Sequence, residues 1–208
     1  RAPLCTLVHR KEAVSAAINA HPVHASFLQR IPGIFQYYRY FLPAFPLAVR
    51  MLRCPPGRLL ISTSHCVAKD LRPAPGMKHL CYCFTPMRYA WTFHAEYFGR
   101  NVLKRHAVSP LLAMLRRWDR RASRRVDRFV TLSRHVQDRI RRFYGRDADV
   151  VYPPVQTDFF TPDGGPPDDF DLIVSALVPY KRLDLAVRAY TLARRPLKIV
   201  GTGTESAA

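Results

Sequence analysis

The chain has 208 residues, of which 48% are hydrophobic and only 9 are glycine. This composition is typical of globular proteins and excludes collagen-like, low-complexity and wholly disordered chains. No run of about 18 apolar residues occurs, so we expect no membrane-spanning helix. The charge is unusual, because 33 Lys and Arg against 15 Asp and Glu give +18. Such an excess predicts an anionic partner, although the strong preference for Arg over Lys is also what a GC-rich genome produces.

Short apolar runs alternate along the chain with amphipathic stretches. The chain opens on an apolar run at Leu4–Val8, so we expect it to begin within a strand. The later expected strands are Leu59–Thr63, His79–Phe84, Phe129–Leu132, Val150–Tyr152, Leu172–Ala176 and Leu197–Val200. The expected helices are Ile34–Phe41, Pro46–Arg53, Tyr89–Phe98, Pro110–Val126, Arg134–Tyr144 and Leu183–Ala193. This alternation predicts an α/β fold with parallel sheets.

Five cysteines occur without a Cys-x-x-Cys pair, which argues against a disulfide framework and favours a reducing compartment. Cys81 and Cys83 alternate within one expected strand and therefore share a face. We interpret them as buried free thiols. The alternative is a metal site that would also use His79.

A segment rich in Pro, Gly and Asp divides the chain. Residues 154–170 lack apolar periodicity, which is typical of a linker. We expect one domain over residues 1–153 and the start of a second over residues 171–208. The second segment holds only strand, helix and strand, too little to bury a sheet. Both domains are therefore expected to be incomplete in this chain.

The positive charge is concentrated in residues 100–146, which hold 15 Lys and Arg against 3 Asp and Glu. Within the expected helix Pro110–Val126, for which Ser109 would be the cap, apolar residues form one stripe: Leu111, Leu115, Trp118, Ala122 and Val126. The opposite side carries Arg116, Arg117, Arg120, Arg121, Arg124 and Arg125. This face is either solvated or lies against anionic lipid. Nucleic acid is a weaker alternative, because zinc-finger spacing and RNP motifs are absent.

Two cations stand at the start of an expected helix. Lys181 and Arg182 follow a buried strand and precede Leu183–Ala193. Cations are unfavourable at a helix N-terminus unless an anion binds there, so we predict a phosphate site. The alternative is that Asp184 relieves the repulsion. After the next strand, Gly201 and Gly203 form a Gly-x-Gly that would let the backbone approach a ligand closely.

Polar residues also follow two strands of the first domain. His65 and Lys69 come after one expected strand, and Arg88 and Tyr89 come after the next. The carboxyl ends of parallel strands are where such folds bind ligands, so we interpret these residues as part of a cleft. The alternatives are an ordinary helix start for the first pair and an Arg stacked on aromatic rings for the second.

Taken in order, eight segments resemble glycosyltransferases of family 4, the two-domain GT-B enzymes. They are Ser26–Gly33, Tyr37–Ala48, Ser62–Lys69, Cys81–Trp91, Leu115–Ser133, Val150–Phe160, Val174–Tyr190 and Ile199–Glu205. The similarity is greatest to bacterial mannosyltransferase-like members that build surface polysaccharides. The resemblance implies two Rossmann-like domains across a cleft, with the donor held by the C-terminal one.

The resemblance also implies an activity. It is the retaining, metal-independent transfer of a sugar, such as mannose from GDP-mannose, to a lipid-linked or glycan acceptor. Lys181 matches the lysine that contacts the donor diphosphate. Phe84, Thr85 and Pro86 lie where members often read His-Thr-Pro, in which the His faces the acceptor. The resemblance places the enzyme in the cytoplasm, peripherally on the inner face of the plasma membrane, with no nucleic acid expected.

Three departures support a different interpretation. Phe84 cannot relay a proton, and Thr92 stands where an Asp is common. The glycine-rich loop before the first domain and the E-x7-E donor motif after the second are expected outside residues 1–208. The alternative to an active transferase is therefore a truncated or degenerate copy that has lost catalysis.

Overall fold

The computed structural model describes residues 1–92, 102–162 and 164–205, with no description of the side chains of Arg39 and residues 102–108. The chain forms two compact units, Arg1–Pro154 and Val155–Ala208.

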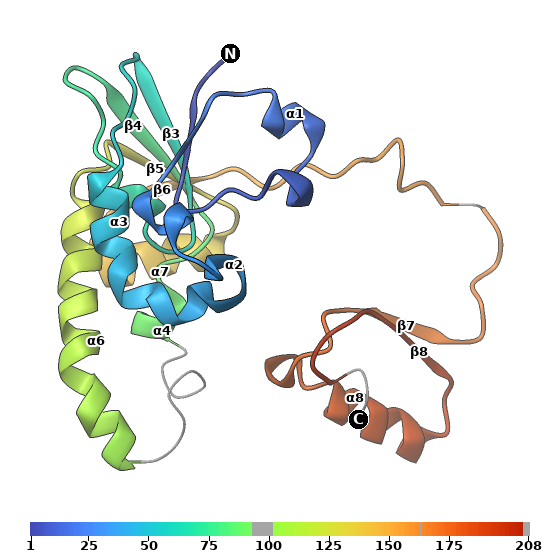
Figure 1. Cartoon of the computed structure of the whole chain (residues 1–208). Helices are drawn as coiled ribbons and strands as arrows, with labels where there is room; N and C mark the ends of the chain where they lie inside the picture. The colour runs from blue at the N-terminus through green and yellow to red at the C-terminus, as the bar shows by residue number, and fades with distance from the viewer. Residues whose placement is uncertain (93–101, 163, 206–208) are drawn as a thin grey trace. The chain divides into compact units, whose positions relative to one another are not determined.

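The first unit is built on parallel strands. They are β1 (Leu4–Thr6), β2 (Val23–Ala25), β3 (Leu59–Ser64), β4 (Lys78–Cys83), β5 (Arg128–Thr131) and β6 (Ala148–Val150). The last four form one parallel sheet in the order β3-β4-β5-β6, and β1 pairs in parallel with β2. Figure 1 shows the four-stranded sheet with the long helix α6 beside it. The predicted α/β class with parallel sheets is confirmed.

Its helices are α1 (Ala16–Asn19), α2 (Ile34–Tyr37), α3 (Phe45–Met51), α4 (Arg88–Trp91), α6 (Val102–Ser123) and α7 (Arg134–Tyr144). The 3-10 turns are η1 (Lys11–Ala13), η2 (Phe27–Arg30), η3 (Tyr38–Ala44) and η4 (Ala68–Asp70). The helix expected at Tyr89–Phe98 is observed as α4, and its second half lies outside the described residues. The elements between residues 11 and 30 were not predicted, because they are short and lack clear periodicity.

Only one face of the sheet is buried. In β3 the residues alternate, so that Leu60, Ser62 and Ser64 are buried while Leu59 and Ile61 are exposed. The parallel register places His79, Cys81 and Cys83 of β4 on the same buried face. All five cysteines are free, and Cys81 and Cys83 are fully buried, as the alternation predicted.

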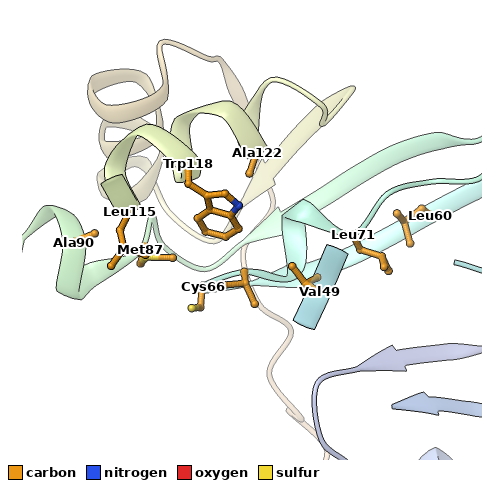
Figure 2. Close-up of a cluster of buried hydrophobic side chains, with 10 residues drawn as sticks. Val49, Leu60, Cys66, Leu71, Met87, Ala90, Leu115, Trp118 and Ala122 are labelled. Carbon is orange, nitrogen blue, oxygen red and sulfur yellow. The ribbon is translucent and has the colours of Figure 1, made fainter. Parts of the chain in front are cut away.

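Two hydrophobic clusters fill this face. The first joins α3, β3, the residues on either side of η4, α4 and α6, and Figure 2 shows Trp118 on the helix that carries Leu115 and Ala122, near Cys66 and Val49. The second packs α7 against β4, β5 and β6. The apolar stripe predicted for residues 111–126 is confirmed, because its members pack in these two clusters.

The predicted start of this helix is wrong. Helix α6 begins at Val102, so Pro110 lies inside it and Ser109 is not its cap. Proline is favoured in the first turn of a helix, which is why it predicted a start, but a long helix can also contain one at the cost of a lost backbone hydrogen bond and a steric clash with the preceding turn. By contrast, α7 has the predicted bounds. Ser133 Oγ accepts a hydrogen bond from Val136 N at 3.3 Å, and Gly145 ends the helix at φ 64°.

The second unit contains β7 (Asp171–Val174), η5 (Pro179–Lys181), α8 (Leu183–Ala193) and β8 (Leu197–Val200). The two strands are parallel, with Ile173 opposite Ile199. A parallel strand–helix–strand unit of this kind places the loops that follow both strands at the same edge.

The buried His79 makes the stability of the first unit depend on pH. Its Nε2 lies 2.8 Å from Ser62 Oγ, and burial lowers its pKa to about 4. An unfolded histidine titrates near pH 6.5, so between these values the unfolded chain holds a proton that the folded chain lacks. The stabilisation is therefore complete above pH 6.5. It falls by up to about 3 kcal/mol as the pH drops to 4.

Urea unfolding between pH 4 and pH 7 measures this effect. His79→Gln retains a hydrogen-bonding partner for Ser62 without a titrating group, so its unfolding free energy should depend less steeply on pH. Equal slopes for the two proteins over this range would contradict the assignment to His79.

Candidate functional site

The loops that follow β3 and β4 meet at the carboxyl edge of the sheet. Cys66 Sγ lies 2.8 Å from the Tyr89 hydroxyl and links the two loops. His65 is exposed beside them. Partial desolvation, and then the charges of Arg88 and Lys69, lower the pKa of His65. The structure thus brings His65, Arg88 and Tyr89 to one edge.

The Phe-Thr-Pro segment lies at the same edge. Phe84 N donates to Ser64 O at 2.8 Å, so this residue extends the pairing of β4 with β3. The Phe84 ring is 40% exposed and meets Tyr82 edge-on at 5.4 Å. Thr85 is half-buried and Pro86 is buried. An apolar ring therefore occupies the place at which a proton-transferring histidine was expected from the resemblance.

Lys69 does not face a cleft, which corrects its interpretation as a cleft residue. Its side chain is 1% exposed, and Nζ lies 2.5 Å from Asp119 Oδ1. Nζ also donates to Cys66 O at 2.7 Å. Burial alone would lower the pKa of Lys69, but the charge and hydrogen bond of Asp119 raise it. The pattern of apolar residues around Lys69 in the sequence did not indicate that its side chain would be buried in an ion pair.

Asp119 holds three segments of the first unit together. Besides Lys69, its carboxylate accepts from Trp91 Nε1 and from the Tyr144 hydroxyl, both at 2.8 Å. These donors come from α4 and α7, which follow β4 and β5. Sequence reasoning missed Asp119. The signal was an acid on the apolar stripe of an arginine-rich helix, one position after Trp118 and four after Leu115.

The six arginines predicted to share one face lie in the last turns of α6 and directly after it, and they fall into two groups. Three contact the protein itself: Arg116 Nε donates to Ala90 O at 2.6 Å, Arg120 Nε donates to Phe143 O at 3.0 Å, and Arg125 pairs with buried Asp70. The other three are exposed, namely Arg117, Arg121 and Arg124. The second group presents an outward cationic surface, to which the exposed Arg120 is adjacent.

In the second unit, the cations and glycines predicted for the donor lie at one strand edge. Leu177 N, after β7, donates to Thr202 O, after β8, at 2.9 Å. A side chain at Gly201 would overlap Ser175 O, and one at Gly203 would overlap the backbone of Leu177. Both glycines are therefore required for the packing of the two loops, a reason different from the predicted approach to a ligand.

The two cations of this edge differ. The Arg182 guanidinium binds both carboxylate oxygens of Asp184, at 2.9 and 3.0 Å, and its hydrogen bond lowers the pKa of Asp184. The Lys181 ammonium lies over the Tyr180 ring at 5.8 Å. Among the carboxylates that the structure describes, none forms an ion pair with Lys181. Lys181 is thus the cation available to an anion from solution.

A family model described as Glycosyltransferase Family 4 matches residues 73–159. The matched segment covers less than half of the chain and is similar to this family. In the first unit this segment runs from before β4 to the chain after β6, and so includes Phe84, Arg88, the arginines of α6 and all of α7. Family 4 indicates glycosyl transfer in general, with a nucleotide-sugar donor and an acceptor.

Comparison with curated proteins and with solved structures finds no match. Within the described parts of this chain, no helix combines the length and apolarity needed to cross a membrane. The same parts contain no group of three or more His, Cys, Asp or Glu residues arranged to hold a metal ion.

Proposed function

We propose that the protein is a retaining glycosyltransferase that moves mannose from a nucleotide-diphosphate sugar to a lipid-linked or glycan acceptor in surface polysaccharide biosynthesis. The observation that carries the proposal is the Lys181 ammonium of η5, in the connection after β7, which forms no ion pair with a carboxylate that the structure describes. The family 4 segment supports the transferase class.

The roles of the two units follow from this proposal. A cation at the β7 edge stabilises the negative charge that develops on the leaving diphosphate. The edge of the first unit, with His65, Thr85, Arg88 and Tyr89, receives the acceptor. The proposal includes transfer without a bound metal, so a chelator should leave the rate unchanged.

Calorimetry on the full-length protein tests the donor. GDP-mannose should bind with release or uptake of heat, and mannose transfer to a lipid-linked acceptor should leave the product with the anomeric configuration of the donor. If neither GDP- nor UDP-sugars bind, the proposed function is wrong.

The second candidate is an inactive copy, and Phe84 is the observation that favours it. Its half-exposed ring has no group that exchanges a proton. Replacing Phe84 by His distinguishes the two. A protein that transfers sugar only as Phe84→His is a degenerate copy, whereas an active wild type does not need a histidine there.

The proposed location is cytoplasmic, with peripheral contact to the inner face of the plasma membrane. Arg117, Arg121 and Arg124 support it, because exposed cations near anionic lipid each contribute about 1 kcal/mol. Sedimentation with anionic and neutral vesicles measures the contact, and equal sedimentation with both would contradict it.

A further inference from the structure

Two arginines converge at the acceptor edge of the first unit. Arg88 begins α4 directly after β4, and Arg139 lies on α7 after β5. Arg139 Nη2 donates to Thr92 Oγ1 at 2.9 Å, and that hydroxyl donates to Arg88 O at 3.3 Å. Two segments that are 47 residues apart in sequence are thus joined through Thr92.

Of the carboxylates in the described ranges, none forms an ion pair with Arg88 or Arg139. This sets them apart from Arg50, Arg125, Arg128, Arg141, Arg182 and Arg195, each of which pairs with an aspartate. Desolvation, together with the charge of Arg88, lowers the pKa of Arg139. His65 adds a third basic group.

The Nε atom of Arg139 is buried and has no hydrogen-bond partner among the described atoms. A buried donor without an acceptor is costly, and the partial desolvation of the Arg139 guanidinium beside a second cation adds to that cost. The ring of Phe143, 6.0 Å from the Arg139 guanidinium, accounts for the packing of this side chain but not for the unused donor.

We propose that Arg88 and Arg139, together with Thr92, bind a phosphate or diphosphate group of the acceptor. This rests on the proposed function and deepens it, because it selects a lipid-linked diphosphate over an uncharged glycan. Guanidinium groups suit such a group, since their N–H donors match phosphate oxygens in pairs. The donor diphosphate belongs to Lys181 in the second unit, so the two anions have separate sites.

Direct binding tests the proposal with the full chain. Lys181→Ala serves as the background, so that the expected donor site does not bind the probe. The probes are geranyl diphosphate, inorganic pyrophosphate and geraniol, titrated into the background protein and into variants that add Arg139→Gln or Arg88→Gln. Arg142→Gln is the matched control, because Arg142 lies on the same helix over the same Phe143 ring at 5.6 Å.

Both diphosphates should bind about 10-fold more weakly to Arg139→Gln and Arg88→Gln, the effect of losing one charged hydrogen-bonding group, and equally well to Arg142→Gln. Geraniol should not bind measurably. Equal affinities in Arg139→Gln and Arg142→Gln would overturn the proposal. Binding of pyrophosphate without geranyl diphosphate would overturn its assignment to a lipid-linked acceptor.

Two separate controls measure whether the variants fold and whether the protein binds the sugar donor. Thermal unfolding compares Arg139→Gln with Arg142→Gln, and Arg139→Lys replaces the first variant if it unfolds. GDP-mannose binding by the wild type is measured in parallel. Its absence refutes the proposed transferase, whereas the effect of Arg139→Gln on diphosphate affinity decides the anion site alone.

Discussion

Asp119→Ala is expected to lower the unfolding free energy of the first unit by about 3–5 kcal/mol, the cost of leaving a buried charge without its partner. The substitution leaves the ammonium of Lys69, whose side chain is 1% exposed, without its carboxylate partner. It also removes the acceptor for Trp91 Nε1 and the Tyr144 hydroxyl. Because domains are stable by only about 5–15 kcal/mol, the variant should be close to unfolded at ambient temperature.

Urea unfolding of the single and double variants measures the effect. The double variant Lys69→Met, Asp119→Leu removes both charges and should be more stable than Asp119→Ala, since well-packed apolar residues often replace a buried ion pair without loss. Arg121→Ala, at an exposed position on the same helix, is the control and should change stability by less than about 0.5 kcal/mol. If Asp119→Ala unfolds like this control, the pair has no structural role.

Lys181→Ala is expected to lower kcat about 100- to 1000-fold, the usual cost of removing one group that stabilises charge in a transition state. Lys181 is the cation of its strand edge that no described carboxylate neutralises. The charge on the leaving diphosphate grows during transfer, so kcat should fall more than the affinity for GDP-mannose does.

Steady-state transfer assays with varied GDP-mannose separate the two parameters. Arg188→Ala is the matched control, because Arg188 is an exposed cation on α8 that acts on Asp184. It should retain kcat within a factor of about 3. A Lys181→Ala enzyme with unchanged kcat would show that the diphosphate binds elsewhere.

The elements that the sequence predicted correctly depend on residues that are close together in the chain. The bounds of α7 and α8 follow from apolar periodicity with Ser133 and Gly145 at the ends of the former. The buried thiols Cys81 and Cys83 follow from strict alternation in β4. The helix start predicted from Pro110 is wrong, because a proline favours the first turn of a helix but can also lie inside a helix that begins earlier.

The sequence by itself determined the parallel α/β class, the elements that carry the family 4 segment, and the placement of Lys181 before a helix. These depend on neighbours in the chain, whose spacing can be read directly. Only the tertiary structure decided that Lys69 is buried against Asp119, that Gly201 and Gly203 pack on Ser175 and Leu177, and that Thr92 links Arg139 to the backbone of Arg88. Each of these features depends on residues that are 24 to 51 positions apart in the chain. Contacts between residues so far apart produce no hydrophobic period and no motif spacing that can be recognised in the sequence.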